Sequence, residues 1–231
     1  MTHRYDILHK VLTLDPQKDC QEIVFLVGSY EYPFLMVKAL EFALFRTYAV
    51  PSISALLAKT GRFEHAGQRR YDDTSLLISE FVEEGYDSVR GRAAIRQMNR
   101  LHQRFTISND DYLYVLSTFV FTPIYFHRQF GWRTPTQHEN IANFTFWHEV
   151  GKRMNIEHLP ATIEEFEAFH RAYERDNSSM PIPTAKSRTT PLPCSAHGIL
   201  RFCRRWCARL STPSWMSRYA KRSAIPKAIL C

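Results

Sequence analysis

The chain has 231 residues, of which 45% are hydrophobic and 13% aromatic, as expected for one ordinary domain with a substantial core. Its net charge of +7 is unevenly distributed, because ten of the 30 basic residues and none of the 23 acidic ones follow Asp176. The body is therefore mildly acidic, which excludes a nucleic-acid-binding domain built around a basic face. An odd count of 5 cysteines and a start without a hydrophobic run indicate reduced thiols in an intracellular protein.

The first helices are marked by prolines and capping residues. Asp15 is a plausible N-cap for a helix running through LDPQKDCQEIVFLV. Pro33 opens a longer helix, which ends before Pro51. The charged residues within it favour a buried or amphipathic helix over a membrane span; they are Lys38, Glu41 and Arg46. The aromatic residues of the same segment are candidates for a pocket or for the ordinary core; they are Phe34, Phe42, Phe45 and Tyr48.

The segment RAAIRQMNRLHQRF, residues 92–105, is the stretch around which the rest is organised. Its apolar residues recur at helical spacing and predict one buried stripe; they are Ala94, Met98, Leu101 and Phe105. His102 lies within this stripe. A histidine that a helix directs into an apolar interior is either a neutral, hydrogen-bonded core residue or a ligand of a metal or haem iron. The helix pattern alone favours the core residue.

Upstream, residues 74–85 predict a helix that ends at Gly85. Just before it, Arg70, Asp73 and Thr74 share one helical face. By spacing alone they predict a surface cluster in which Arg70 pairs with Asp73.

Three helices are predicted downstream. The segment from Asp110 to Phe130 is apolar nearly all round and should be central, with Ser108 or Asn109 as its cap; a strand is the alternative for VLSTFVF. A further helix begins near Thr136, and it carries His148, the alternative iron ligand. The last begins at Thr162, with Glu165 completing a capping box, and its His170 is expected to face solvent.

Several pieces of the chain, in their order and spacing, resemble one known family. They are RRYDDTSLLISEF, MNRLHQRFTISNDDYLYVLSTFVFTPIYF, FGWRTPT and FWHEVGKRMNI, and the resemblance covers roughly residues 15–175. The chain is similar to the catalytic domain shared by the fungal MpaB oxygenases and the bacterial latex-clearing (rubber) oxygenases. This resemblance implies an all-α fold, a single helical domain with a globin-like core over residues 1–176, and haem b as the cofactor.

The resemblance also implies roles for individual residues. The histidine of the RLH element, here His102, corresponds to the proximal ligand of the haem iron. The Arg-x-x-Lys-Thr set of the rubber oxygenases maps to Arg70, Asp73 and Thr74, so an aspartate stands where that branch has a lysine. Arg70 is expected to interact with dioxygen or a haem propionate, Thr74 to donate a hydrogen bond, and Asp73 to orient Arg70 or move a proton. The implied reaction is oxidative cleavage of a carbon–carbon double bond in an apolar isoprenoid chain by dioxygen.

Residues 177–231 differ in character from the body. They begin with a Pro/Ser/Thr-rich linker and continue as a basic amphipathic segment, which is suited to peripheral contact with an anionic membrane. We expect this tail to be poorly ordered. Cys203, Cys207 and His197 are too few for a zinc site of the usual paired type.

The membrane helix of the fungal relatives is not seen in this chain, which predicts a soluble member or an N-terminally incomplete one, cytoplasmic or associated with the endoplasmic reticulum. Two other functions stay open: a non-catalytic haem binder and a membrane-associating helical protein without a cofactor.

Overall fold

The computed structural model describes residues 4–59 and 62–178, and all regular structure in these two ranges is helical. The predicted all-α class is therefore confirmed for them, while the globin-like arrangement stays a prediction. In chain order the elements are α1 (Asp6–Thr13), α2 (Cys20–Leu26), the π-helix η1 (Val27–Glu31), α3 (Pro33–Thr47), α4 (Pro51–Lys59), α5 (Arg62–Glu83), α6 (Val89–His102), α7 (Asn109–Phe130), α8 (Gln137–Arg153) and α9 (Ile163–Asn177).

A hydroxyl side chain caps the start of each of the last four helices. The caps are Ser88, Ser108, Thr136 and Thr162, and each accepts a hydrogen bond, 2.8 to 3.2 Å long, from the backbone N–H three residues on. Such a bond satisfies one of the N–H groups that a helix leaves without a partner, which fixes the first turn locally. The predicted starts of α7, α8 and α9 are confirmed, and Gly85, at φ +88°, follows α5 as predicted.

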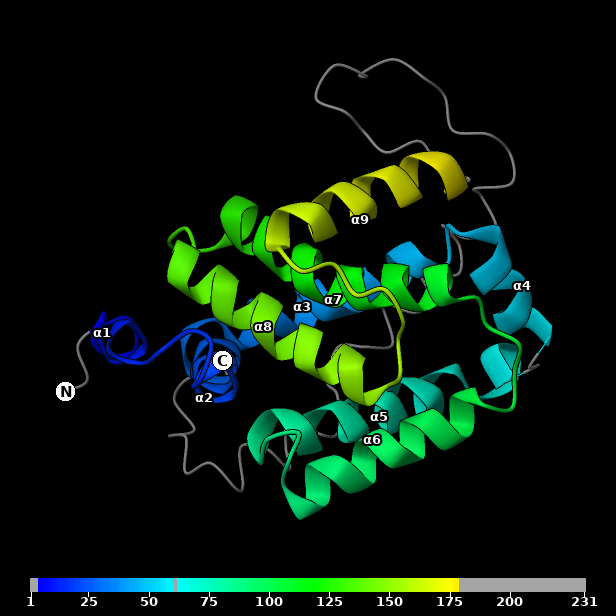
Figure 1. Ribbon diagram of the computed structural model, residues 1–231, viewed down its shortest axis with the longest axis horizontal. Helices are drawn as coiled ribbons and strands as arrows, with labels where there is room; N and C mark the ends of the chain where they lie inside the picture. Colours follow the sequence, from blue (N-terminus) through cyan, green and yellow to red (C-terminus); the bar gives the residue numbers. More distant parts are fainter. Residues whose placement is uncertain (1–3, 60–61, 179–231) are drawn as a thin grey trace.

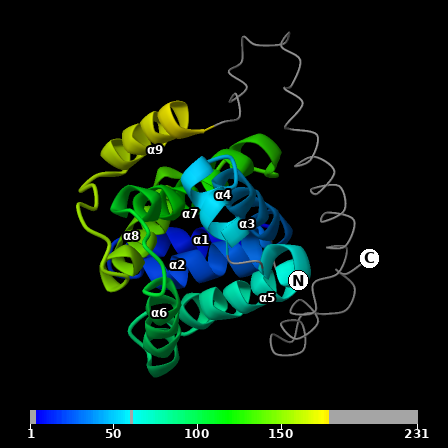
Figure 2. The ribbon, with the colours of Figure 1, turned by 90° about the vertical axis from the view of Figure 1, so that its right-hand side faces the viewer.

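Helix α7 is the central element, and it packs against α3, α8 and α9. Figure 1 shows α9 along one side of α7, while α5 and α6 form an antiparallel pair on the opposite side of the molecule; Figure 2 shows the same order from the side. Helix α2 packs between α8 and α5, and α4 contacts α5. The segment VLSTFVF lies within α7, so the strand alternative is wrong.

Aromatic side chains from different helices form much of the core. Phe81 of α5 is fully buried, and its ring centroid lies 6.3 Å from that of Phe146 and 6.1 Å from that of Trp147, both on α8. Trp147 in turn stacks on Phe119 of α7 at 4.8 Å. Burying one such side chain contributes about 1.5–3 kcal/mol, so these contacts hold the α5 layer against α7 and α8.

The beginning of the chain differs from the prediction. Helix α1 was not expected, and Asp15 does not cap a helix, since α2 begins only at Cys20. Oδ1 of Asp15 instead accepts hydrogen bonds from the backbone N–H groups of Gln17 and Lys18, at 2.8 and 3.0 Å. An aspartate can satisfy the amides of a turn in the same way as those of a helix start, and the local sequence did not distinguish the two.

Two expected sets of buried aromatic residues are also partly wrong. Helix α6 ends at His102, so Phe105 lies beyond it and is exposed instead of continuing the buried stripe. On α3, Phe34 and Phe42 are 61% and 43% exposed, so neither belongs to the buried core.

Within the described ranges, no single helix has both the length and the apolar character needed to cross a membrane. Residues 20–31 and 33–47 meet those two criteria only when taken together, and they are bent by 108° relative to each other.

Candidate functional site

A cavity of about 280 Å³ lies between the α5–α6 pair and α7, and the ends of α3, α4 and α8 complete its described walls. Most of its lining is apolar. Four residues of α7 contribute one continuous stripe, namely Tyr112, Val115, Leu116 and Phe119. The size approaches that of common ligand pockets, which enclose about 300–1,000 Å³. An apolar lining with a few polar groups suits a mainly hydrocarbon ligand.

His102, the predicted iron ligand, lies in the wall of this cavity at the last residue of α6. Its ring meets that of Tyr112 edge to face, with 5.6 Å between the ring centroids. The predicted stripe of α6 reaches the same space through Met98 and Leu101. The end of α6 therefore places an imidazole against apolar walls, as expected if His102 holds a ligand.

Thr74 lies in the same cavity wall, on the face of α5 that also contributes Leu77 and Ile78. His102 and Thr74, which are 28 residues apart in the chain, thus border one space because α5 and α6 pair. The helical register that places Thr74 inward turns Asp73 outward.

Asp73 is not among the described lining residues. Its side chain is 64% exposed, and its Oδ2 lies 3.9 Å from Nε of Arg69, which is itself exposed. The pairing with Arg70, predicted from spacing, falls outside the described part, which does not include the Arg70 side chain. Where the structure describes Asp73, it has the surroundings of a surface carboxylate.

His148, the alternative iron ligand, is half-buried on α8 and is not among the lining residues. Its ring lies 5.4 Å from that of Phe144, and burial lowers its pKa. In the described part of the chain, no group of three or more His, Cys, Asp or Glu residues is arranged to hold a metal ion. Cys203, Cys207 and His197 lie outside the described residues.

Sequence reasoning missed several polar residues of the cavity, namely Thr47, Tyr71 and Asp111, and it took Tyr112 as only part of an aromatic helix. Burial raises the pKa of Tyr71 and that of Tyr112, so both remain neutral hydroxyls at ordinary pH. Asp111 was detectable in principle, because Asp111, Val115 and Phe119 recur at every fourth position and so share a face of α7. An acidic residue in the first turn of a helix is otherwise explained by the helix dipole alone.

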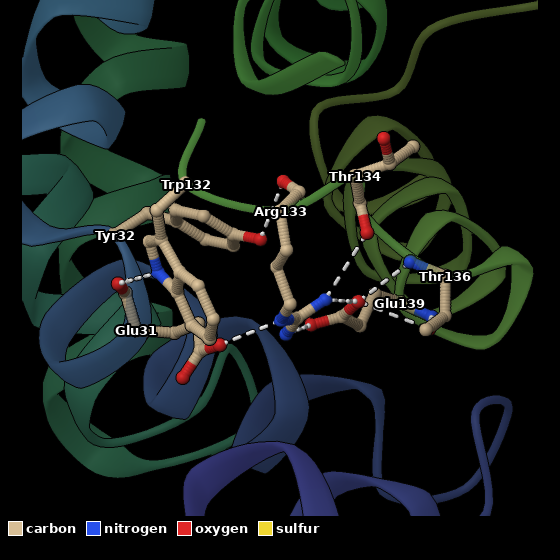
Figure 3. Close-up of polar contacts among 7 residues, drawn as sticks. All are labelled: Glu31, Tyr32, Trp132, Arg133, Thr134, Thr136 and Glu139. Carbon is tan, nitrogen blue, oxygen red and sulfur yellow. Dashed lines mark hydrogen bonds and ion pairs between the residues drawn. The ribbon is translucent and has the colours of Figure 1, made fainter. Parts of the chain in front are cut away.

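A second polar cluster lies at the other end of α7, and it joins neighbouring elements of the fold. Figure 3 shows the guanidinium of Arg133 between the carboxylates of Glu31 and Glu139. Arg133 donates to Oε1 of Glu31 at 2.7 Å and to both oxygens of Glu139 at 2.6 and 2.8 Å. All three side chains are largely buried. The cluster attaches the turn after α7 to η1 and to the start of α8.

The pKa of Glu139 reflects this arrangement. Burial by itself would raise the pKa, but the hydrogen bonds from Arg133 and from the backbone N–H of Thr136 outweigh burial and hold it below its usual value. Oε2 of Glu139 also completes the capping box of α8 with Thr136. One carboxylate therefore both caps a helix and binds a buried cation.

His170 is 1% exposed, so the expectation that it faces solvent is wrong. Its Nδ1 lies 2.8 Å from Oγ of Ser117, and its ring stacks on that of Tyr114 at 5.8 Å. Glu174, one turn further along α9, accepts from the Tyr114 hydroxyl at 3.0 Å and is paired with Arg46 of α3. Burial lowers the pKa of His170 to about 4, so it remains neutral. Helix α9 is thus held to α7 by polar bonds inside an apolar contact.

The fold and the cavity together define a class: an all-helical domain with a largely apolar cavity and a histidine in its wall. The chain matches the family described as "ER-bound oxygenase mpaB/B'/Rubber oxygenase, catalytic domain" over residues 31–222, and it belongs to that family. The matched region continues past residue 176, into the segment that the sequence analysis separates as a tail.

Three curated relatives support this assignment. The chain is 33% identical over 222 residues to the "ER-bound oxygenase mpaB" of Penicillium brevicompactum, covering 88% of this chain and 55% of the relative. It is 40% identical over 132 residues to the protein of the same name from Penicillium roqueforti, covering 54% and 44%. It is 35% identical over 180 residues to the "ER-bound oxygenase mpaB'" of Penicillium brevicompactum, covering 70% and 42%. The chain spans about half the length of these relatives.

Proposed function

We propose that this chain is a haem-b-dependent oxygenase that cleaves a carbon–carbon double bond in an apolar, isoprenoid-type substrate. The observation that carries the proposal is the position of His102, in the wall of an apolar cavity that Thr74 also lines. Membership of an oxygenase family supports the reaction class. The names of the relatives extend the proposal to association with the endoplasmic reticulum, which cell fractionation would test.

The residues of the cavity fit a haem group. A single imidazole is enough to hold it, because the porphyrin supplies the in-plane nitrogen ligands itself. The described wall around His102 consists mainly of aliphatic and aromatic side chains, which suit the faces of a macrocycle. When bound, haem would supply the redox chemistry that activates dioxygen, which protein side chains lack.

The protein's own residues would bind and orient the haem and the substrate, and they would exclude water. His102 would hold the iron through one ring nitrogen, and the edge of its ring against Tyr112 restricts rotation of the imidazole. Thr74 would donate a hydrogen bond inside the cavity, since its hydroxyl is one of the two polar groups, with that of Tyr71, that α5 contributes to the described lining. Arg70 keeps its predicted role near dioxygen or a propionate. Asp73 lies on the exposed face of α5, so it would act through a neighbouring residue and would not contact the substrate itself.

The proposed step balances without an outside reductant. The double bond of the substrate breaks, each of its two carbons receives one oxygen atom of dioxygen, and two carbonyl groups form. The apolar walls bind the chain by the hydrophobic effect and exclude water from the reacting carbons.

The test is an absorption spectrum of the full chain supplied with haem, for the wild type, His102→Ala and His148→Ala. We expect a Soret band in the wild type and in His148→Ala, which removes a half-buried histidine outside the cavity lining. The band should disappear in His102→Ala, while circular dichroism confirms that the variant is folded. Full haem retention by His102→Ala would refute the ligand assignment. Oxygen uptake with an unsaturated terpenoid, measured on the same samples, separates an oxygenase from a non-catalytic haem binder.

A further inference from the structure

A group of exposed aromatic side chains lies where α3 meets the end of α7. Phe34, Phe42 and Phe130 are 61%, 43% and 55% exposed. The ring centroid of Phe126, one turn before Phe130, lies 6.3 Å from that of Phe42 and 4.7 Å from that of Phe130, so rings from both helices form one surface. These four residues make up the aromatic face. Large apolar side chains that are exposed together mark a contact with a protein or a membrane.

Helical register places these rings on the outer side of both helices. Phe34, Lys38 and Phe42 recur at every fourth position of α3, and Phe126 and Phe130 do so on α7. The two helices pack against each other through their other sides. The aromatic face is therefore fixed by the same contact that places α7 at the centre of the fold.

The exposed charges around the aromatic face are positive. Nζ of Lys38 lies 5.8 Å from the ring centroid of Phe34, and Arg128 is exposed beside the end of α7. In α3 and the last two turns of α7 the single acidic residue is Glu41, whose side chain is only 8% exposed and pairs with Lys38 at 2.9 Å. Aromatic rings are favoured at the interface of a bilayer, and anionic headgroups attract basic side chains. The surface therefore has the composition of a membrane contact.

Helix α3 also connects the aromatic face with the cavity. Leu44 and Thr47, in its last turn, line the cavity, and Tyr48 directly after the helix does so too. An apolar substrate partitions into a bilayer by the hydrophobic effect. A domain that contacts the bilayer through α3 therefore holds its cavity close to the source of such a substrate.

We propose that the aromatic face docks the domain on an anionic lipid bilayer, with Phe34, Phe42 and Phe130 entering the interfacial layer. This inference rests on the proposed association with the endoplasmic reticulum and adds the surface that makes the contact. A second copy of the chain, packed on the same face by two-fold symmetry, would bring like charges together. The basic segment after Asp176 would also meet positive charge here. Anionic lipid headgroups supply the opposite charge.

The first experiment places a fluorescent reporter in the aromatic face. Phe34→Trp keeps a large aromatic side chain at an exposed position. The matched control is Leu76→Trp, because Leu76 of α5 is 43% exposed and lies outside both the aromatic face and the cavity lining. Each full-length, haem-supplied variant is mixed with phosphatidylcholine vesicles containing phosphatidylserine, with and without brominated acyl chains, which quench tryptophan on contact. After subtraction of the wild-type signal, the brominated lipid should quench Phe34→Trp and leave Leu76→Trp unchanged.

The second experiment removes the rings. Phe34→Ser combined with Phe130→Ser should weaken binding to the same vesicles about tenfold in a flotation assay, because two large side chains no longer leave water. Leu76→Ser should bind as the wild type does. Sedimentation velocity without vesicles measures self-association of each protein, and circular dichroism with thermal unfolding checks the fold.

The outcomes separate this inference from its alternatives. Vesicle binding without quenching of Phe34→Trp would overturn the inference, because another surface, such as the basic segment after Asp176, would then make the contact. Self-association that the serine variant loses, with vesicle binding unchanged, would overturn it and assign the aromatic face to a second copy. Failure of the wild type to bind vesicles would overturn it as well, while the haem spectrum and oxygen uptake, which need no membrane, still test the proposed reaction.

Discussion

Replacing Arg133 by methionine tests whether the buried cluster at the end of α7 holds the fold together. The change removes one cation and leaves two carboxylates, Glu31 and Glu139, whose side chains are 3% and 2% exposed. Removing one partner of a buried pair costs about 3–5 kcal/mol, because the remaining charge is desolvated without compensation. Glu139 keeps its capping bonds to Thr136, which limits the loss at that residue. This loss is a large fraction of a total stability of about 5–15 kcal/mol.

The assay is urea denaturation at pH 7, followed by circular dichroism, with Arg171→Met as the matched control. Arg171 also pairs with a glutamate, Glu167, but its side chain is 69% exposed, and such pairs contribute about 0–1 kcal/mol. The effect of Arg133→Met should also shrink at acidic pH. The wild type holds the pKa of Glu139 below 4.5, so the stability that this carboxylate contributes is present above that value and is lost as the pH falls below it. Equal losses for the two variants at pH 7 would refute the reasoning.

Two further predictions concern pH and packing. His127 and His170 are buried, and burial lowers the pKa of each to about 4. As the pH falls, these histidines are protonated in the unfolded chain before they are protonated in the folded one, so the free energy of unfolding should fall by on the order of 2 kcal/mol for each between pH 7 and pH 5. Unchanged urea midpoints over that range would contradict this. Gly91→Ala would place a Cβ 2.1 Å from the carbonyl oxygen of Gly85, so the stability measured by thermal unfolding should fall by about 1–3 kcal/mol. Gly28→Ala is the control and should be nearly neutral, because its Cβ would lie 3.5 Å from Met36. Equal melting temperatures for the two variants would contradict the prediction.

The helix starts were predictable because their causes are local. Ser108, Thr136 and Thr162 each cap a helix through a hydrogen bond to an amide three residues on, and this geometry needs no other part of the chain. The prediction that Asp15 caps a helix was wrong for the same reason, because an aspartate accepts hydrogen bonds from the amides of an isolated turn equally well. The position of His102 on an apolar stripe was also readable, and the structure places it in the cavity wall.

The polar interior was not predictable from periodicity. His170 was expected to face solvent, but Ser117 and Tyr114, more than 50 residues earlier in the chain, provide a buried polar environment. Only the approach of α4 and α9 shows that Oδ1 of Asp111 accepts hydrogen bonds from the hydroxyls of Ser52 and Tyr173. Partners brought together by tertiary contacts leave no spacing pattern in the sequence.

The sequence by itself determined the all-helical class, the starts of the later helices and the histidine on an apolar stripe, because backbone geometry and side-chain period depend on neighbouring residues. Only the tertiary structure decided that His102 and Thr74 border one cavity while Asp73 faces outward, and that Arg133 joins two buried carboxylates. These relations depend on how helices cross, and the packing of complete apolar faces sets those crossings.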